Sequence, residues 1–513
     1  MTTNTQAAQN PLLEGMRRDL TPEPCLAVIF GATGDLTGRK LLPALYALAR
    51  EQFLPARFAV LGVARKAWSD EAFRELARAA VQEHGRYPPE GESWAAFAGS
   101  LYASSADADR PGSFAQLAER VAQLDRDCGT GGNRLHYLAV PPSVFLPLLT
   151  QLGEVGLART GARGYARVIV EKPFGHGLES ARRLTREMRT VLAEDQIFRM
   201  DHYLGKETVQ NLYVFRFANS LFEPLWNRNY VDHVQIAVAE SIGVGSRGRS
   251  FEEAGTLRDV MQNHMLQLLS LVAMEPPSRF GARQVRDEKV KVLRAVHSPH
   301  GEDALARTVR GQYGRGIVHG ESVPGYREED GVPPGSSVET YAAVRLEIEN
   351  WRWAGVPFYL RAGKRLAKRV TEIAIQFRPV PHLPFRERAV QGQPNSLLLR
   401  IQPDEGIALL FEAKVPGART ELQSVKMDFL YGTSFGQEPP EAYERLLLDA
   451  FLGDATLFAR DDEVEAAWGI VDPVHAAWTD RPDASLAIYP AGSWGPAEGD
   501  ALVGAEGRAW RRL

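Results

Sequence analysis

Apolar and polar positions follow two different patterns along this chain. Across residues 25–50 a short apolar, β-branched run passes through glycines and continues with leucines at helical spacing, which predicts a strand, a turn and a helix. Further strands are predicted at 57–65, 134–140 and 166–175, with a serine-capped helix at 69–85. This alternation over the first 200 residues is typical of a doubly wound parallel sheet.

Beyond about residue 230 the alternating stretches become longer. They predict the strands of a larger, mostly antiparallel sheet at 232–241, 337–350, 369–379, 395–403 and 406–417. Apolar helices are predicted at 255–274 and 441–454. Residues 300–337 are rich in glycine, proline and charge, which predicts long surface loops.

The two patterns together predict an α/β plus α+β fold with two domains. A length of 513 residues also exceeds the size at which one hydrophobic core usually stops growing. We expect a flexible N-terminal arm over residues 1–22, a Rossmann-like dinucleotide-binding domain over 23–200, and an α+β domain for substrate binding and oligomerisation over 201–513.

Composition narrows the classes of function. The formal net charge is −4, from 60 basic and 64 acidic residues, which gives no overall attraction for nucleic acid or an anionic membrane. Cys25 and Cys128 show neither a disulfide framework nor a metal-ligand spacing, so we expect a cytoplasmic protein without a metal site. The first twenty residues lack the continuous apolar core of a signal peptide, and the longest apolar run, around residues 265–274, is too short to span a bilayer.

A glycine-containing turn, GATGDL at residues 31–36, follows the first predicted strand. Glycines at such a turn let backbone N–H groups approach a pyrophosphate, which the helix dipole also favours. The spacing is GxxG rather than GxGxxG, so a plain strand-to-helix turn is the alternative. Its place in the first βα unit favours a dinucleotide site, with candidate residues Gly31, Thr33, Gly34, Asp35 and Leu36.

Two cations, Arg65 and Lys66, end the second predicted strand. An NAD site usually carries an acid there for the ribose hydroxyls, whereas arginine binds a 2′-phosphate with two parallel hydrogen bonds. This position therefore favours NADP over NAD, with Arg65 as the candidate residue. The alternative is that both side chains are solvated cations at a strand end.

A second candidate segment is EKPFG, residues 171–175, which follows a predicted strand. Lys172 thus lies at the carboxyl end of a parallel strand, where open α/β sheets bind ligands, and Pro173 is a candidate for a tight or cis turn. The alternative is an exposed loop with a solvated lysine.

The segment FRMDHYLGKETVQN, residues 198–211, crowds an acid, an imidazole, a phenol and an ammonium together. His202, Tyr203 and Lys206 could converge on a phosphate while Asp201 points elsewhere, because neighbouring side chains diverge. The alternative is structural, with His202 hydrogen-bonded at a domain junction and Lys206 a cation at a helix end.

His264 falls on the apolar stripe of the predicted helix 255–274. A histidine in that place is most often a satisfied core residue. A catalytic base would need a carboxylate to orient the imidazole and stabilise its protonated form, and Asp201 is the available candidate.

Five segments appear in a fixed order: GATGDL, EKPFG, RMDHYLGKE, RDVMQNHMLQLL and FYLRAGKRL. In this order they resemble the glucose-6-phosphate dehydrogenase family, and the similarity runs from about residue 25 to YPAGSWGP, residues 489–496. The chain departs from the usual family pattern at Met200, where isoleucine is common, and at Thr37 and Gly38, where relatives commonly have alanine and lysine.

The resemblance implies oxidation of glucose 6-phosphate at C1 to 6-phosphogluconolactone with hydride transfer to NADP, the first step of the oxidative pentose phosphate pathway, in a homodimer or homotetramer. It makes His264 the general base and Asp201 its partner. The other implied residues are the phosphate or sugar ligands His202, Tyr203, Lys206 and Lys364, the acceptors for sugar hydroxyls Glu240 and Asp259, Lys172 between nicotinamide and sugar, and the further ligand positions Arg369 and Gln402.

Two alternatives remain from the sequence. One is an oxidoreductase of another sugar class that shares the Rossmann domain and the EKP turn but lacks DHYLGK. The other is a nucleotide-sensing relative without enzymatic activity, which loss of His264, Asp201 or Lys206 would favour; all three are present.

Overall fold

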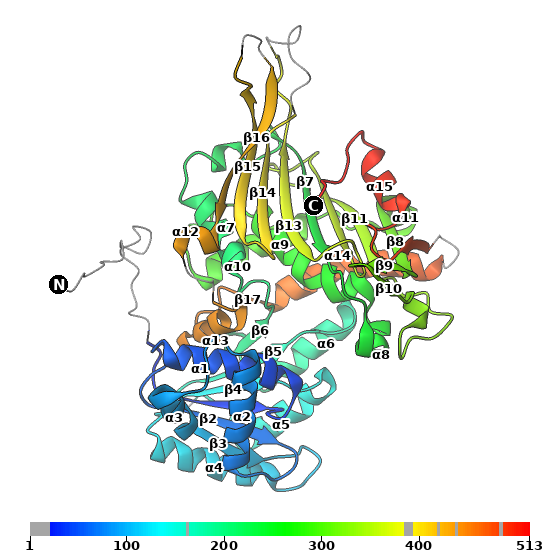
Figure 1. Ribbon diagram of the computed structural model, residues 1–513. Helices are drawn as coiled ribbons and strands as arrows, with labels where there is room; N and C mark the ends of the chain where they lie inside the picture. The colour runs from blue at the N-terminus through cyan, green and yellow to red at the C-terminus, as the bar shows by residue number, and fades with distance from the viewer. Residues whose placement is uncertain (1–20, 161–163, 384–392, 418–420, 437–439, 482–485) are drawn as a thin grey trace, which may run out of the picture.

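The computed structural model describes residues 21–513 except 161–163, 384–392, 418–420, 437–439 and 482–485. Most of the predicted N-terminal arm therefore lies outside the described residues. Figure 1 shows the chain as two sheets with helices around them, the blue and cyan N-terminal part below and the larger yellow-green sheet above. Both predicted parts of the fold are confirmed.

The first sheet has seven strands in the order β17-β6-β5-β4-β1-β2-β3, all parallel except β17. β1 is apolar and buried along its whole length, as in a parallel sheet covered on both faces. The strands are β1 Cys25–Phe30, β2 Phe58–Ala64, β3 Leu101–Ser105, β4 Arg134–Leu138, β5 Ala166–Glu171, β6 Ile197–Met200 and β17 Phe458–Ala459.

Helices connect these strands. The helix after β1 is π-helical over Thr37–Leu41 and continues as α1 Leu42–Arg50. α2 Asp70–His84 begins after the predicted cap, since the hydroxyl oxygen of Ser69 accepts a hydrogen bond from the backbone N–H of Ala72 at 3.2 Å. The others are α3 Gly91–Gly99, α4 Ser113–Asp127, α5 Phe145–Glu154 and α6 Leu178–Met188.

The second sheet has nine strands in the order β16-β15-β14-β13-β7-β12-β11-β8-β18, and only the pairs β7–β12 and β8–β18 are parallel. Its strands are β7 Val231–Ala239, β8 Thr308–Gly314, β11 Tyr341–Glu347, β12 Pro357–Gly363, β13 Val370–Phe377, β14 Ser396–Gln402, β15 Gly406–Lys414, β16 Leu422–Leu430 and β18 Ala487–Pro490. A separate hairpin consists of β9 Gly316–Val318 and β10 Glu321–Val323.

Helices of the second half pack below and beside the large sheet (Figure 1). They are α7 Glu207–Phe217, α8 Gly248–Glu252, a π-helix Leu257–Met265 continued by α9 Leu266–Ala273, α10 Ala282–Ala295, α11 Gly301–Arg307, α12 Tyr431–Phe435, α13 Ala442–Leu452, α14 Asp461–Asp480 and α15 Ala497–Gly504. Within the described ranges, none of these helices is both long and apolar enough to cross a membrane.

The prediction of long surface loops over residues 300–337 was wrong for the first part of this segment. This segment contains α11 and β8, and β8 lies inside the nine-stranded sheet. Buried polar side chains hid the strand, because Gln312 is almost fully buried and its amide donates to the carbonyls of Ser336 and Val338 at 3.0 and 2.8 Å. A strand that buries satisfied polar groups lacks the apolar alternation by which strands are recognised.

Two C-terminal elements return to the first domain, which the predicted division at residue 200 did not anticipate. β17 adds to the edge of the parallel sheet by antiparallel pairing with β6. α13 lies beside α1, and the ring of Phe451 in α13 meets the ring of Phe58 in β2 edge to face, with centroids 5.5 Å apart. The first domain is thus completed by residues from far along the chain.

Candidate active site

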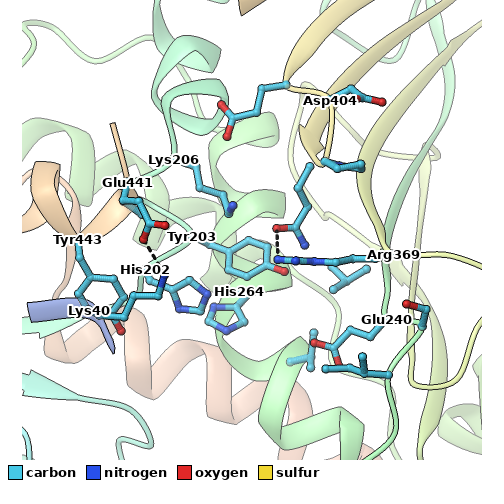
Figure 2. A pocket seen from close by; sticks show the side chains of 18 of the residues that line it. Lys40, His202, Tyr203, Lys206, Glu240, His264, Arg369, Asp404, Glu441 and Tyr443 are labelled. Carbon is cyan, nitrogen blue, oxygen red and sulfur yellow. Dashed lines mark hydrogen bonds and ion pairs between the residues drawn. The ribbon is translucent and has the colours of Figure 1, made fainter. Parts of the chain in front are cut away.

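A cavity of about 890 Å³ lies where the two domains meet, and Figure 2 shows the side chains around it. Its walls come from the ends of β5, β6, β7, β12 and β14 and from the π-helix Leu257–Met265. The cavity is lined by every predicted substrate-binding residue together with His264: Lys172, His202, Tyr203, Lys206, Glu240, Asp259, Lys364, Arg369 and Gln402.

His264 and Asp201 form a hydrogen-bonded pair at the wall of this cavity. Nδ1 of His264 lies 2.5 Å from Oδ1 of Asp201, and both side chains are buried. Burial raises the pKa of Asp201, but the neighbouring His264 outweighs it and holds that pKa below its ordinary value. Asp201 is therefore a carboxylate that can only accept, so Nδ1 carries the proton and Nε2 keeps a free lone pair.

The imidazole of His264 is held by its surroundings. The Tyr203 ring stacks on it with a centroid distance of 4.2 Å, and the His202 ring meets it edge-on at 4.8 Å. The backbone N–H of Tyr203 also donates to Oδ1 of Asp201 at 3.0 Å. Burial lowers the pKa of His264 and Asp201 only partly opposes this, so the ring is neutral near pH 7.

Acids and ammonium groups pair at one side of the cavity. Nζ of Lys172 lies 3.0 Å from Oδ1 of Asp259, and Lys364 makes a close ion pair with Glu240. Burial raises the pKa of Asp259, but Lys172 and Lys364 outweigh it and bring the pKa to about 2. This side thus offers both hydrogen-bond acceptors and donors, as a polyhydroxylated ligand requires.

The other side of the cavity carries the cations Lys206 and Arg369, with the acids Glu405 and Glu441 near Lys206. Lys206, at the N-terminus of α7, has no ion pair or side-chain hydrogen bond among the described residues, and burial lowers its pKa. Its Nζ lies 5.8 Å from the centroid of the Tyr203 ring, and Figure 2 shows the end of Arg369 near the same ring. An ammonium without a counter-ion in a partly buried place favours a bound anion.

His202 lies beside these cations but is itself uncharged. Burial, and then the proximity of His264, lower its pKa to about 3. Near neutral pH it therefore provides one donor and one acceptor rather than a third positive charge.

The structure adds residues to the cavity that the sequence had not indicated: Lys40, Arg247, Glu405, Glu441 and Tyr443. Nζ of Lys40 pairs with Glu441 at 2.6 Å, and the ring of Tyr443 lies parallel to that of His202 at 6.4 Å. Lys40 lies in the helix that directly follows the glycine turn, and this position could have indicated it as a candidate site residue. Tyr443 comes from α13, and no local pattern relates it to residues near position 200.

The glycine turn closes the end of β1. Gly31 has φ +84°, and a Cβ there would lie 2.2 Å from the carbonyl oxygen of Ala139, so only glycine fits. The backbone N–H groups of Gly31 and Ala32 donate to Val63 at the end of β2, at 3.1 and 3.2 Å. Thr37, one of the departures from the family pattern, donates its hydroxyl to the Gly31 carbonyl at 3.0 Å.

This corner of the sheet fits the phosphates of a dinucleotide. Thr33, Gly34 and Asp35 are exposed there, Leu36 is partly exposed, and the helix begins at once, so its first N–H groups lack intrahelical partners. Arg65 follows β2 and is also exposed. None of these residues lines the large cavity; they lie at the carboxyl edge of the sheet beside it.

A smaller cavity of about 300 Å³ adjoins the large one and shares Lys172, Asp259 and Lys364 with it. Pro142 and Pro173, which follow β4 and β5, line its other side, and the Lys172–Pro173 peptide bond is cis. Lys172 therefore lies between a space at the sheet edge, where open α/β sheets bind ligands, and the large cavity.

Comparisons with known families cover almost the whole chain. The family model described as "Glucose-6-phosphate dehydrogenase, NAD binding domain" matches residues 28–211. The one described as "Glucose-6-phosphate dehydrogenase, C-terminal domain" matches residues 213–511.

Individual proteins agree with these matches. The chain is 50% identical over 493 residues to glucose-6-phosphate 1-dehydrogenase of Aggregatibacter actinomycetemcomitans, covering 96% of this chain and 98% of the relative. It is 48% identical over 492 residues to glucose-6-phosphate 1-dehydrogenase 2 of Mycobacterium tuberculosis, covering 95% of each.

Solved structures give the same result. A glucose-6-phosphate dehydrogenase in complex with its substrate glucose 6-phosphate superposes with a TM-score of 0.87 at 36% identity, covering 97% of this chain and 100% of that one. The enzyme of Mycobacterium avium superposes with a TM-score of 0.81 at 39% identity, covering 96% and 99%.

Proposed function

The chain belongs to the glucose-6-phosphate dehydrogenase family, and on that premise we propose how its own residues carry out the reaction. It is an oxidoreductase that oxidises glucose 6-phosphate at C1 to 6-phosphogluconolactone, the first step of the oxidative pentose phosphate pathway, with a nicotinamide dinucleotide as cofactor. The observation that carries the assignment of residues is the Asp201–His264 pair at the wall of the cavity. The activity itself is tested by the absorbance of the reduced nicotinamide, measured with glucose 6-phosphate and then with glucose as the substrate.

His264 is the general base for the C1 hydroxyl. Its Nε2 has a free lone pair because Nδ1–H is donated to Asp201, and its neutral state near pH 7 suits proton removal. When the C1 proton moves to Nε2, the carboxylate of Asp201 stabilises the imidazolium that forms. A nicotinamide dinucleotide, when bound at the sheet edge, would supply the hydride acceptor for this oxidation.

The paired side of the cavity orients the sugar. The carboxylates of Glu240 and Asp259 accept hydrogen bonds from sugar hydroxyls, while Lys172 and Lys364 donate to sugar oxygens and hold the pKa of Asp259 below its ordinary value. Lys172 also faces the smaller cavity at the sheet edge, which has the position expected for the nicotinamide end of the cofactor.

The cationic side binds the phosphate. Lys206 supplies a charge that lacks a partner in the described structure, Arg369 lies near it, and the neutral His202 and the phenol of Tyr203 can donate hydrogen bonds. Binding energy from this non-reacting group helps to hold C1 in line with the base and the hydride acceptor. Gln402, whose Oε1 lies 3.5 Å from the guanidinium of Arg369, supports that side.

The two alternatives from the sequence, an oxidoreductase of another sugar class and a nucleotide-sensing relative without activity, are not supported. Matches of the family models from residue 28 to residue 511 leave no place for a different class of sugar oxidoreductase. His264, Asp201 and Lys206 lie together at one cavity, so nothing favours a relative that only senses a nucleotide.

NADP is the cofactor that we propose in particular. The glycine turn is hydrogen-bonded to Val63, and Arg65 is exposed two residues later, so this residue lies at the same corner of the sheet as the turn. With the pyrophosphate at the helix N-terminus, this corner is where the adenosine ribose is expected, and arginine suits its 2′-phosphate.

We expect Arg65→Ala to raise KM for NADP about tenfold or more and to leave KM for NAD nearly unchanged, because only NADP has the 2′-phosphate. Initial rates with each cofactor at saturating glucose 6-phosphate measure this. Lys66→Ala is the matched control, since it removes one positive charge from the next residue, which is also exposed. An equal loss with both cofactors would show that Arg65 does not read the 2′-phosphate.

We also infer a homodimer or homotetramer. Six consecutive residues of β16 are exposed, and β16 ends the nine-stranded sheet with no further strand beside it among the described residues. Exposed strands with apolar side chains at a sheet edge are typical of surfaces that associate.

Met427 of β16 is 63% exposed, and Met427→Lys should shift the assembly toward smaller species in sedimentation velocity. Ile317→Lys, at a residue 67% exposed in the separate β9–β10 hairpin, is the control and should leave the assembly unchanged. A wild-type protein that sediments as a monomer at micromolar concentration would contradict the inference.

A further inference from the structure

Glu171, the last residue of β5, receives two hydrogen bonds at one oxygen atom. The hydroxyl of Tyr137 in β4 donates to its Oε1 at 2.5 Å, and the hydroxyl of Tyr443 in α13 donates to the same atom at 3.2 Å. Glu171 does not line the large cavity, and neither does Tyr137, whereas Tyr443 does. The carboxylate of Glu171 therefore contacts a cavity-lining residue, Tyr443, from outside the cavity and links it to the parallel sheet.

α13 as a whole is fixed to the first domain. At its C-terminal end, the guanidinium of Arg167 in β5 donates to the last carbonyls of the helix, at 2.9 and 2.6 Å, where a cation also complements the helix dipole. At its N-terminal end, Arg86 pairs with the buried Glu444 and Lys40 pairs with Glu441, both at 2.6 Å. These contacts place the helix axis but do not set the direction of the Tyr443 ring.

The direction of that ring matters because of what lies against it. Tyr443 is parallel to His202 at an interplanar angle of 12°, and His202 in turn meets both Tyr203 and His264 edge-on. The phenol oxygen lies at the end of the long axis of a tyrosine ring, so a hydrogen bond at this oxygen restrains the direction of that axis beyond what packing provides. Glu171 is the partner that defines it.

We propose that Glu171 is a positioning residue for the sugar phosphate, acting through Tyr443. Its carboxylate oxygen holds the Tyr443 hydroxyl and so keeps the Tyr443 and His202 rings as one preformed wall beside the phosphate side of the cavity. This inference rests on the proposed function, because it assumes that a phosphorylated sugar binds there. It gives the first domain, which holds the cofactor, a direct link to the substrate wall.

The role depends on an acceptor atom and not on negative charge. Glu171→Leu removes the acceptor, so the Tyr443 ring becomes free, and we expect the Kd and KM for glucose 6-phosphate to rise about tenfold with kcat within about twofold. Glu171→Gln keeps an acceptor oxygen and should restore both constants to within about threefold of wild type. KM for NADP should stay unchanged in both variants.

Two tyrosines on the same oxygen supply a matched pair of variants. Tyr443→Phe should reproduce the rise in Kd, whereas Tyr137→Phe, which removes the other hydrogen bond, should lower Tm without changing Kd. The double variant Glu171→Leu with Tyr443→Phe should bind no more weakly than the weaker single variant, because both changes break one link. This comparison does not need Glu171→Leu to be stable, since the two tyrosine variants already separate the outcomes.

Calorimetric titration of glucose 6-phosphate, without cofactor, measures Kd independently of turnover. Three outcomes would overturn the positioning role. The first is a wild-type Kd in Tyr443→Phe, and the second is an increase in Kd in the double variant equal to the sum of the two single effects. The third is an equal increase in Kd in Glu171→Gln and in Glu171→Leu. A wild-type protein that neither binds nor oxidises glucose 6-phosphate would instead overturn the proposed function, so the two failures are distinct.

Discussion

His264→Asn should lower kcat by about 10²–10⁴, the range that a general base contributes, while Tm and the KM for glucose 6-phosphate stay close to wild type. The reason is local: His264 lines the cavity, and its ring is already held by Asp201 and by the stacked Tyr203. Substrate binding relies on other residues, so the loss is expected in turnover.

Asparagine is the informative replacement. Its side-chain amide can still donate to Oδ1 of Asp201, so the buried carboxylate is not left without a partner, which would itself be destabilising. Steady-state kinetics and thermal unfolding of the same preparation give the answer. If His264 were a core residue only, Tm would fall while the folded protein kept most of its kcat.

Asp201→Asn should lower kcat in the same direction but less than His264→Asn does, because the imidazole stays in place and loses only its orienting carboxylate. The sign of the pH effect also follows. Burial lowers the pKa of His264 and Asp201 opposes this, so removing the charge lowers that pKa further. The acidic limb of kcat/KM should then move to lower pH, with a lower plateau because the base is weaker; a move to higher pH would contradict the pairing.

Lys206→Ala is the second large effect that we expect. Truncating one member of a buried, hydrogen-bonded charge pair costs about 2–5 kcal/mol, so kcat/KM for glucose 6-phosphate should fall about a hundredfold or more. No ion pair of Lys206 is found in the part of the chain that the structure describes, so a phosphate would be its counter-ion. KM for NADP should not change.

Three comparisons sharpen this test. Turnover of unphosphorylated glucose should be low in the wild type and unaffected by Lys206→Ala, and Lys206→Arg, which keeps the charge, should restore part of the loss. Burial lowers the pKa of Lys206, which means that the charged form destabilises the unliganded fold, so Tm of the alanine variant should not fall. An equal loss with both sugars would place Lys206 elsewhere in the reaction.

The parts of the fold that could be predicted from sequence are those in which one local pattern decides the outcome. β1 is apolar at every position because both of its faces are covered, and α2 has its serine cap in place. β8 was missed because its buried Gln312 is satisfied by backbone carbonyls, which no periodicity reveals. The place of β17 could not be predicted from its own sequence either, because its partner strand β6 lies more than 250 positions away.

The site divides in the same way. Motifs near positions 172, 201–206 and 264 indicated residues that the fold brings together at one cavity, because residues that follow strands of one sheet meet at its edge. Their partners could not be chosen from spacing: a histidine on an apolar stripe has no visible relation to Asp201 until the fold brings Nδ1 and Oδ1 to 2.5 Å. Tyr443 and Glu441 were missed for the same reason, since α13 reaches the cavity only through its contact with the first domain.

The return of β17 to the parallel sheet has a consequence for synthesis of the chain on the ribosome. β6 ends at Met200, but its outer neighbour does not leave the exit tunnel until residues 458–459 have been made. Until then the nascent N-terminal domain presents β6 as an unpaired edge, open to pairing with another chain. This order of assembly implies that chaperones protect the β6 edge during that interval. It also implies that fragments ending near residue 200 are poorly soluble.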